Sequence, residues 1–276
     1  MRLHECRMVG NNQTKLKGEI KMAETAVKNK RVLEAYEGFV KHMKAFLEEQ
    51  QFNHEEYTNF VNWADRLGRS GEIPLFLDVF VETHVLEAKY KDAPGTEPSL
   101  LGPYYVENPP LLEGSKVVIP QRPDEPGDKL KFYGNVSSVN GPLANTKVDW
   151  WQDDADGLYS NYDSTAPDFN LRGQFYTDEN GDFEVEAIVP IPYQIPTNGP
   201  TGEFTFAAGY HAYRPAHIHI KFEHEGHESL ITQVFFEGDQ WLETDVAGGV
   251  RSSLTTKLVD KGDYKEASLN FVMRTE

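Results

Sequence analysis

The chain is poor in cysteine and in positive charge, and it has no long apolar run. Cys6 is the single cysteine among 276 residues, so no disulfide can form within the chain, and a secreted disulfide scaffold is excluded. A reducing cytoplasm is therefore the expected compartment. Lys and Arg number 27 against 44 Asp and Glu, and this excess of negative charge disfavours nucleic acid and anionic membranes as partners. No stretch reaches the ~18 apolar residues that span a bilayer, so we expect no membrane span.

The residues that are present suffice for a globular fold, because 39% of them are hydrophobic and 12% are aromatic. A chain of this length can hold one large domain or two modest ones. Its opening residues are polar and lack the apolar run of a signal peptide. We expect residues 1–30 to be a polar, disordered tail that precedes the folded chain.

The next part of the chain has the periodicity of helices. Apolar residues recur at three- and four-residue spacing over 31–50, which predicts an amphipathic helix. A second helix is predicted over 54–68, with Asn53 as its cap. A third and more apolar helix is predicted over 74–89, where Pro74 occupies a tolerated first-turn position. The sequence therefore predicts a helical region over residues 31–98.

The pattern period becomes two after the helices. Asn140-Gly141 and Asn180-Gly181 each lie between two predicted strands, as in β-hairpins. Further strands are predicted at "AHIHIKFE", "SLITQVFFEG" and "ASLNFVMR". We therefore expect a mainly β protein, with an antiparallel two-sheet β-sandwich over 99–276 preceded by the α-helical N-terminal region.

The segment "RPAHIHI" places His217 and His219 two residues apart. On a strand both imidazoles project from one face, so they suit either a metal site or the solvent side of a half-buried strand. His224 or His227 could supply a third zinc ligand, but "EHEGHES" is typical of an exposed hairpin tip. The carboxylates of "DDAD" could suggest a glycosidase, although adjacent acids more often form a solvated turn.

Tyrosines are the other candidate ligands in this part of the chain. A phenol with an ordinary pKa of ~10 loses its proton at neutral pH only to a strong Lewis acid, and ferric iron qualifies. Two phenolates and a hydroxide would balance its charge, so two tyrosines and two neutral histidines form a consistent site. Packing or hydrogen bonding is the alternative for each tyrosine, and the periodicity does not select a pair. The candidates are Tyr159, Tyr162, Tyr193 and Tyr213.

The runs "DGLYS", "PIPYQIPTNGPTGEF" and "RPAHIHI", in this order and spacing, resemble the intradiol ring-cleaving dioxygenases of the catechol 1,2-dioxygenase type. The resemblance extends from about residue 31 to the C-terminus. It implies one non-haem Fe(III) per chain, bound by Tyr159, Tyr193, His217 and His219. Tyr162 is disfavoured, because the family ligand is the tyrosine that follows "DGL".

The resemblance also implies the reaction and its further residues. A small aromatic diol reacts with O2, both oxygen atoms enter the product, and a cis,cis-muconate results. Tyr193 acts as the base once the diol binds, Arg214 faces the ring and stabilises its negative charge, and Gln233 lies near the same pocket. A surface ion pair and a strand amide are the alternatives for Arg214 and Gln233. The substrate-binding residues implied besides Arg214 are Leu75, Asp78 and Val79, whose alternatives are core packing and, for Asp78, a solvated helix face.

The preferred ring stays open between two subgroups. "LLGPYYVENPP" and "FEGDQW" resemble chlorocatechol 1,2-dioxygenases, whereas "LRGQF" and the aspartate of "LFLD" also fit hydroxyquinol 1,2-dioxygenases. Tyr210 departs from the common pattern, in which an arginine precedes His211, and "DVAGGV" lacks the cysteine that chlorocatechol enzymes often carry there.

Two further expectations concern partners. The resemblance implies a homodimer through the N-terminal helices, with an apolar tunnel that can hold a lipid, although an ordinary helical core would explain the same apolar stripe. A noncatalytic β-sandwich carrier or carbohydrate-binding module is the alternative from another class. Such a module would not need the two tyrosines and two histidines, and it would be colourless.

Overall fold

The computed structural model describes residues 30–276. The expected tail over residues 1–30 therefore lies outside the described residues, apart from Lys30. The chain divides into two compact units, of which one ends at Val61 and the other begins at Asn62. No helix within residues 30–276 is both long and apolar enough to cross a membrane.

The first unit contains α2, Lys30–Gln50, and the start of α3, His54–Ser70, which confirms the first two predicted helices. The predicted cap of α3 is also present. The Glu56 N–H donates to Asn53 Oδ1 at 3.0 Å, and the Asn53 N–H donates to Glu56 Oε2 at 2.9 Å. This reciprocal pair is a capping box, which satisfies backbone donors that the first helical turn leaves free.

The prediction of one helix over 74–89 is wrong, because two helices occupy this segment. Helix α4 spans Ile73–Phe80 and α5 spans Glu82–Tyr90. Val81 separates them with φ −125° and ψ −37°, outside ordinary helical geometry. The break makes Glu82 the first residue of α5, where its carboxylate accepts the backbone N–H of Leu101 at 3.0 Å. A contact distant in sequence thus competes with continuation of the helix.

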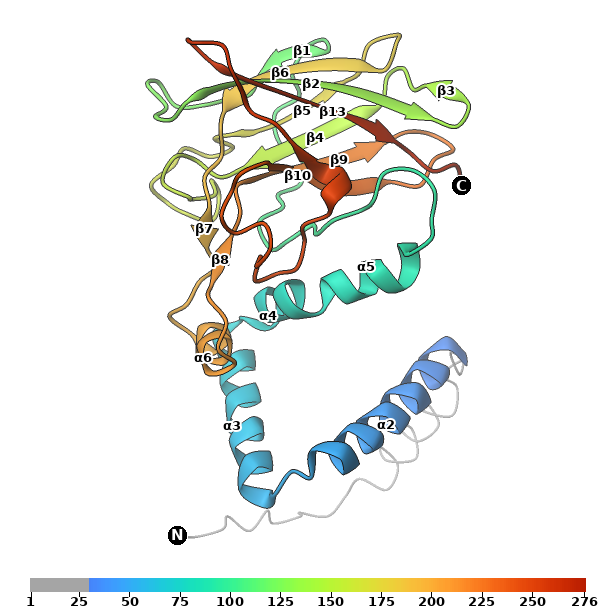
Figure 1. Ribbon diagram of the computed structural model, residues 1–276, viewed down its shortest axis with the longest axis vertical. Helices are drawn as coiled ribbons and strands as arrows, with labels where there is room; N and C mark the ends of the chain where they lie inside the picture. The colour runs from blue at the N-terminus through green and yellow to red at the C-terminus, as the bar shows by residue number, and fades with distance from the viewer. Residues whose placement is uncertain (1–29) are drawn as a thin grey trace, which may run out of the picture. The chain divides into compact units, whose positions relative to one another are not determined.

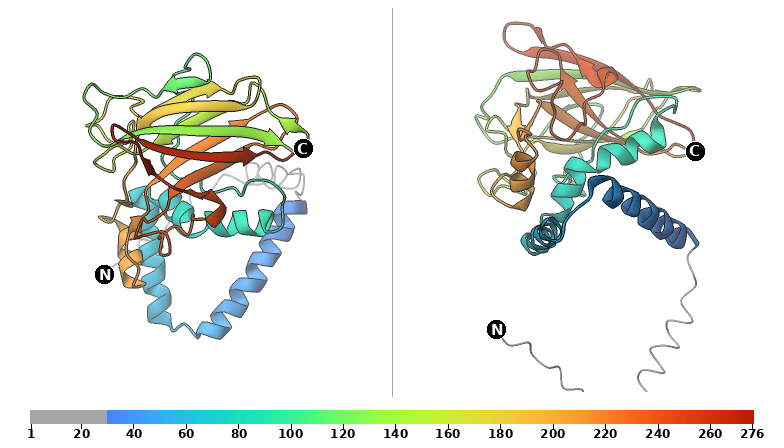
Figure 2. Two further views of the ribbon diagram at one scale, coloured as in Figure 1. Left: turned by 45° about the horizontal axis from the view of Figure 1, so that its top comes forward. Right: turned by 60° about the horizontal axis from the view of Figure 1, so that its bottom comes forward.

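The predicted two-sheet sandwich after the helices is confirmed (Figures 1 and 2). One sheet has six strands in the order β1-β6-β2-β13-β12, with β3 paired to β2, and the other has five in the order β11-β10-β9-β4-β5. A separate ribbon pairs β7 with β8. The strands are β1 Lys116–Val118, β2 Lys129–Ser138, β3 Gly141–Pro142, β4 Lys147–Gln152, β5 Arg172–Tyr176, β6 Asp182–Ile188, β7 Tyr193–Gln194, β8 Tyr213–Arg214, β9 His217–Glu223, β10 Leu230–Phe236, β11 Thr255–Thr256, β12 Val259–Asp260 and β13 Lys265–Val272.

The strand pairing differs from the prediction in two respects. The pairs β1–β6, β2–β13 and β10–β11 are parallel, so the sheets are mixed rather than purely antiparallel. Neither predicted hairpin pairs the two strands expected, because β2 and β4 lie in different sheets, as do β5 and β6. The reversal at Asn140 instead pairs β2 with the two-residue β3. The chain crosses to β4 of the other sheet only after β3, whereas the turn at Asn180-Gly181 leads directly from β5 to β6 of the other sheet. Strands of either sheet bury alternate residues, so this alternation does not say which strands pair.

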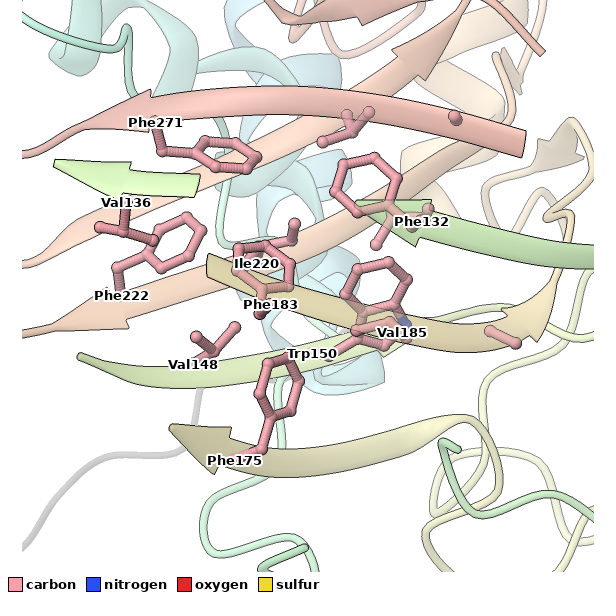
Figure 3. Close-up of a cluster of buried hydrophobic side chains, with 14 of the residues drawn as sticks. Phe132, Val136, Val148, Trp150, Phe175, Phe183, Val185, Ile220, Phe222 and Phe271 are labelled. Atoms are coloured by element: carbon pink, nitrogen blue, oxygen red, sulfur yellow. The ribbon is translucent and has the colours of Figure 1, made fainter. Parts of the chain in front are cut away.

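The core lies between the two sheets, where large apolar side chains from each sheet meet (Figure 3). Phe132 and Phe183 come from the six-stranded sheet, and Trp150 and Phe175 come from the five-stranded sheet. The ring centroids of Phe132 and Trp150 lie 5.5 Å apart across the interface. Such contacts bury most of the apolar surface that stabilises the domain.

The core also decides where the paired histidines point. Ile218 and Ile220 of β9 are fully buried in the intersheet core, so His217 and His219 project from the opposite face of the sheet. The solvent-facing alternative predicts that these two imidazoles are exposed. Each is instead only 1% exposed, because other parts of the fold cover this face.

An aromatic cluster joins the second half of α3, helix α4 and helix α6, Pro200–Ala207. The ring centroid of Phe76 lies 5.0 Å from that of Trp63 and 5.2 Å from that of Phe204, and both ring pairs are edge-on. The Thr201 N–H donates to Glu72 Oε2 at 2.8 Å, which satisfies a backbone donor in the first turn of α6. Because α6 lies between β7 and β8 in the chain, this packing fixes α4 relative to the ribbon that carries Tyr193 and Arg214 (Figure 1).

Candidate active site

The two histidines face each other through the same ring nitrogen. His217 Nε2 and His219 Nε2 lie 3.1 Å apart. His217 Nδ1 lies 2.7 Å from the Pro215 carbonyl oxygen, which can only accept, so the proton of this imidazole is on Nδ1 and the lone pair is on Nε2. His219 stacks on Trp151 with centroids 4.8 Å apart, so its ring orientation is fixed by packing.

Two buried tyrosines complete the cluster. Tyr159 comes from the connection between β4 and β5, and its hydroxyl lies 3.5 Å from His217 Nε2. Tyr193 begins β7, and its ring centroid lies 5.5 Å from that of Tyr159 and 5.6 Å from that of His217. The structure thus brings together all four side chains that the resemblance implies as metal ligands.

The turn before Tyr159 explains how the two tyrosines approach so closely. Asp154 Oδ1 accepts the N–H groups of Asp156 and Leu158, at 2.9 and 3.1 Å, and so closes the turn. Gly157 has a φ of +77°, and a Cβ there would lie 3.0 Å from the Cβ of Tyr193. Glycine is therefore required both by the backbone conformation and by the approach of β7.

Arg214 connects this cluster to a buried hydrogen-bond network. Its Nε and Nη2 donate to the two carboxylate oxygens of Asp245, each at 3.1 Å, in a bidentate pair. Nη2 also donates to Gln233 Oε1 at 3.0 Å, and Nη1 lies 3.1 Å from His217 Nε2. Gln233 in turn lies opposite His219 in the β9–β10 register, with its Nε2 3.1 Å from His219 Nδ1.

Burial and charge set the protonation of these groups. Burial, followed by the charge of Arg214, lowers the pKa of His217 to about 3. Burial and the neighbouring His217 and Arg214 likewise hold the pKa of His219 well below its usual range. Burial raises the pKa of both Tyr159 and Tyr193, and Arg214 opposes the rise in each case. The site thus offers two neutral imidazoles and two phenols that ionise only beside a strong positive charge.

A pocket adjoins the cluster and receives the three residues expected at the ring edge. Leu75, Asp78 and Val79 of α4 line it together with Tyr193 and Arg214. Leu75 and Val79 are buried and also belong to a small apolar cluster, whereas Asp78 is half-buried. Burial, followed by the charge of Glu82, raises the pKa of Asp78 to about 6. Asp78 is therefore not on a fully solvated helix face.

The histidine and tyrosine alternatives lie elsewhere. His224 follows the end of β9, about 16 Å along the strand from His219, and its Nδ1 lies 3.2 Å from that of His227 at the hairpin tip. Tyr162 is exposed and donates to the Tyr105 carbonyl, and Tyr213 stacks on Trp241. None of these four side chains lies among the clustered histidines and tyrosines.

The acidic segment 153–156 is predicted to be a solvated turn. It forms a turn, but only part of it is exposed to solvent. Asp153 and Asp154 are buried, whereas Asp156 is exposed. Burial raises the pKa of Asp153 well above its usual range, and the nearby charge of Asp154 adds to this effect. Asp154 closes the turn that leads to Tyr159, so its position is explained without a glycosidase role.

Several side chains of the site were absent from the sequence-based prediction. Tyr104 stacks on Tyr159 with ring centroids 4.5 Å apart and lines the pocket with Leu100 and Gly102. Asp245 pairs with Arg214, and Glu82 holds the segment that contains Gly102. The segments "LLGPYY" and "DVAGGV" are both conspicuous in the sequence, but neither contains a periodic signal for a ligand or an ion pair.

The donor set fits ferric iron better than it fits zinc. Within residues 30–276 no three or more His, Cys, Asp or Glu side chains are grouped so that they could hold a metal ion. The cluster instead offers two imidazole nitrogens and two phenolic oxygens in a buried place. Phenolates match a strongly Lewis-acidic cation, and neutral imidazoles add no charge that would oppose it.

Comparisons with known proteins agree with this geometry. Residues 100–275 match the family model described as Dioxygenase, and residues 29–96 match the model described as Catechol dioxygenase N terminus. A chlorocatechol 1,2-dioxygenase of Rhodococcus opacus is 36% identical over 253 residues, which cover 89% of this chain and 98% of that protein. A 6-chlorohydroxyquinol 1,2-dioxygenase of Cupriavidus pinatubonensis is 32% identical over 244 residues, which cover 85% of this chain and 87% of that protein.

A solved structure leads to the same group of enzymes. The crystal structure of 3-chlorocatechol 1,2-dioxygenase from Rhodococcus opacus is similar to this fold with a TM-score of 0.81 at 39% identity, and the match covers 89% of this chain and 99% of that one. The chain therefore belongs to the intradiol ring-cleaving dioxygenases of the catechol 1,2-dioxygenase type.

Proposed function

We propose that the protein binds one Fe(III) per chain through Tyr159, Tyr193, His217 and His219 and inserts both atoms of O2 into a catechol to give a cis,cis-muconate. The observation that carries the proposal is the buried meeting of two phenols with two facing imidazole nitrogens, 3.1 Å apart. When bound there, ferric iron would act as the Lewis acid that lowers the proton affinity of the phenols and draws electron density from the diol.

The surrounding residues have distinct tasks in this proposal. Tyr193 is the base that takes a proton from the diol, since its phenol lies next to Arg214, whose charge favours the phenolate. Arg214 stabilises negative charge on the ring, and its pairing with Asp245 holds the guanidinium in place. Gln233 orients both Arg214 and His219 through its amide.

The proposed substrates are catechol and catechols that carry a chloro or hydroxy substituent. Leu75 and Val79 give the pocket an apolar edge that suits a ring, and Asp78 adds a single polar group there. Both a chlorocatechol enzyme and a 6-chlorohydroxyquinol enzyme are among the relatives above 30% identity. Hydroxyquinol 1,2-dioxygenase therefore remains the second candidate within the same reaction class.

We also propose that the protein is a homodimer through its N-terminal helices. Helix α2 buries none of its residues within the chain, although one face carries large apolar side chains. Contiguous apolar surface of this kind is typical of a protein interface. A second copy of the chain is the occupant that we assign, and mass spectrometry of the purified dimer tests for the lipid that the resemblance implies. The exposed apolar residues of this face include Leu33, Tyr36, Phe39, Met43, Phe46 and Leu47.

The purified protein should be wine-red, because tyrosinate-to-Fe(III) charge transfer absorbs visible light, and it should consume O2 when catechol is added. Tyr159→Phe and Tyr193→Phe should each change the absorption band and lower turnover. His217→Ala and His219→Ala should each lose iron. Metal analysis and the visible spectrum measure these effects independently of activity.

His224→Ala and His227→Ala are the matched controls, and both should keep iron and turnover. Equal iron loss from these two variants would contradict the ligand set. A colourless protein fully loaded with zinc would contradict the iron assignment. Binding of catechol without O2 uptake in the iron-loaded protein would favour the noncatalytic carrier instead.

A further inference from the structure

Two carboxyl groups on either side of the break at Val81 interact near the pocket, and the proposed function uses only one of them. Asp78 of α4 lines the pocket, and Glu82 begins α5 four residues later. Glu82 Oε1 accepts the Leu101 N–H at 3.0 Å. Its Oε2 is buried and has no hydrogen-bond partner among the residues that the structure describes. A buried carboxylate with one oxygen lacking a hydrogen bond destabilises the fold, so the position of Glu82 suggests a functional role.

The surroundings of the two carboxyl groups favour different protonation states. Burial raises the pKa of Glu82, but the N–H groups of Leu101 and Gly102 and the charge of Arg214 all oppose the rise. Asp78 has no such support, and burial together with the charge of Glu82 raises its pKa to about 6. Main-chain donors and a nearby cation thus support the charged form of Glu82, whereas the charge of Glu82 opposes ionisation of Asp78.

Glu82 also acts on the position of the iron-ligand candidates through the main chain. The segment that it holds contains Gly102, whose φ is +70° and whose added Cβ would lie 3.4 Å from His219 Cε1. The neighbouring Leu100 carbonyl accepts from Gln233 Nε2 at 3.0 Å. The carboxylate of Glu82 thus fixes the segment that packs against His219 and that carries Tyr104 over Tyr159.

We propose that Glu82 is a positioning residue that holds the 100–104 segment over the site and, through its charge, sets the pH at which Asp78 changes from a hydrogen-bond donor to an acceptor. This inference rests on the proposed function and adds a substrate rule to it. Ionised Asp78 can accept from a ring hydroxyl but has no donor in a chlorine, whereas protonated Asp78 places no unpaired charge beside a chlorine. The preference between chloro- and hydroxycatechols therefore depends on pH.

Other ionisable groups face the same pocket and must be considered. Arg214 stays charged through its pair with Asp245, so its effect on Asp78 is constant with pH. His219 stays neutral because burial holds its pKa well below the usual range. Burial keeps the pKa of Tyr104 and of Tyr193 above the ordinary phenol value. Of the pocket's side chains, Asp78 is the one whose pKa lies near 6, and Glu82 is the charge beside it.

The first test measures kcat/KM for hydroxyquinol and for 4-chlorocatechol between pH 5 and pH 8. In the wild-type enzyme the ratio of the two values should rise about fivefold through pH 6, the size expected for one hydrogen bond gained or lost. Glu82→Gln keeps an acceptor for the backbone but removes the charge, so the rise should move to lower pH. Asp78→Asn should abolish it. Comparison of all variants at each pH cancels the ionisation of the substrates themselves.

The matched control is Glu87→Gln, on the same helix α5 but exposed and paired with His84 and Arg251, neither of which lines the pocket. It should retain the wild-type profile. Glu82→Ala should lower kcat/KM for every ring about tenfold, because the hydrogen bond to the Leu101 N–H is lost together with the charge. Glu82→Gln can still accept this hydrogen bond and should keep most of the activity. A ratio that does not vary with pH in the wild type, or a profile that Glu82→Gln leaves in place, would overturn the proposal.

A second readout does not depend on turnover. The ¹³C signal of the Asp78 carboxyl, assigned by its absence from Asp78→Asn, should titrate with a midpoint near pH 6, and Glu82→Gln should move the midpoint toward the usual range of aspartate. An unmoved midpoint would contradict the coupling. If no catechol supports O2 uptake, the proposed function fails, and the midpoint still decides whether the two carboxyl groups are coupled.

Discussion

Arg214 is the residue on which most of the site depends. Its guanidinium is buried, pairs with Asp245 through two hydrogen bonds, and contacts both Gln233 and His217. Its positive charge disfavours protonation of His217 and favours the phenolate of Tyr193. One cation thus prepares a neutral imidazole and an ionisable phenol in the same cluster. Removal of the positive charge and removal of the planar guanidinium shape are therefore different perturbations of Arg214.

Arg214→Lys should separate these two effects. The ammonium keeps the charge, but it cannot make two parallel bonds to Asp245 while it also donates to Gln233. We expect iron content and colour to persist while ring cleavage slows by roughly 10²- to 10³-fold, as for loss of one electrostatic stabiliser. Arg66→Lys, at an exposed ion pair with Glu203, is the control and should leave turnover unchanged. Wild-type turnover in Arg214→Lys would remove Arg214 from the mechanism.

Two secondary-structure elements position the two phenols. They are the turn that precedes Tyr159 and the β7–β8 ribbon, which begins with Tyr193. Neither is a long strand or helix, and each is held by contacts outside itself. Asp154 closes the turn, and α6 fixes the far end of the ribbon by packing on α3 and α4. Gly157 is the point where the turn and the ribbon touch. Geometry at this contact should therefore control the distance between the phenols.

Gly157→Ala should disturb that distance. An alanine at φ +77° costs ~1–2 kcal/mol in backbone strain, and its methyl group would meet the Cβ of Tyr193 at 3.0 Å. We expect lower stability together with a shifted tyrosinate band and reduced turnover. Gly226→Ala is the matched control, because its φ is +73° but nothing lies within 4 Å of the added Cβ. It should lose a similar amount of stability and keep the band. Equal spectra for both variants would argue against the contact.

For the whole molecule, the feature that residues 30–276 of one chain do not explain is the exposed apolar face of helix α2. Helix α2 spans 21 residues and buries none of them, yet its apolar residues recur with helical periodicity. An isolated helix of this length is marginal in water, and tertiary or quaternary packing usually stabilises it. A second copy of the chain would cover the apolar face.

Phe39→Glu should therefore weaken the dimer. Phe39 is 61% exposed within the chain, and a buried unpaired carboxylate at an interface is strongly unfavourable. Sedimentation should give a dimeric mass for the wild type and a monomeric mass for the variant at micromolar concentration. Val139→Glu, at an exposed site beside the β2–β3 turn, should remain dimeric. A monomeric wild type would contradict the assignment, and circular dichroism would show whether Phe39→Glu stays folded.

The sequence alone determined features that depend on local spacing. The stripe over 31–50 predicts α2, Asn53 predicts the start of α3, and the alternation in "AHIHIKFE" places His217 and His219 on one face of a strand. These signals are local because side-chain direction repeats with the period of the element. Short motifs in a fixed order also predict the family, and the matches to known dioxygenases confirm it.

Only the tertiary structure decided which strands pair, where the third predicted helix breaks, and which side chains surround the histidines. The long strands predicted to pair across Asn140-Gly141 and Asn180-Gly181 lie in different sheets, because burial of both sheets' inner faces outweighs pairing between neighbours in sequence. Glu82 and Asp245 reach the site through contacts with Leu101 and Arg214, 19 and 31 residues away. Such contacts have no period in the sequence, since they form only when the folded chain brings distant segments together.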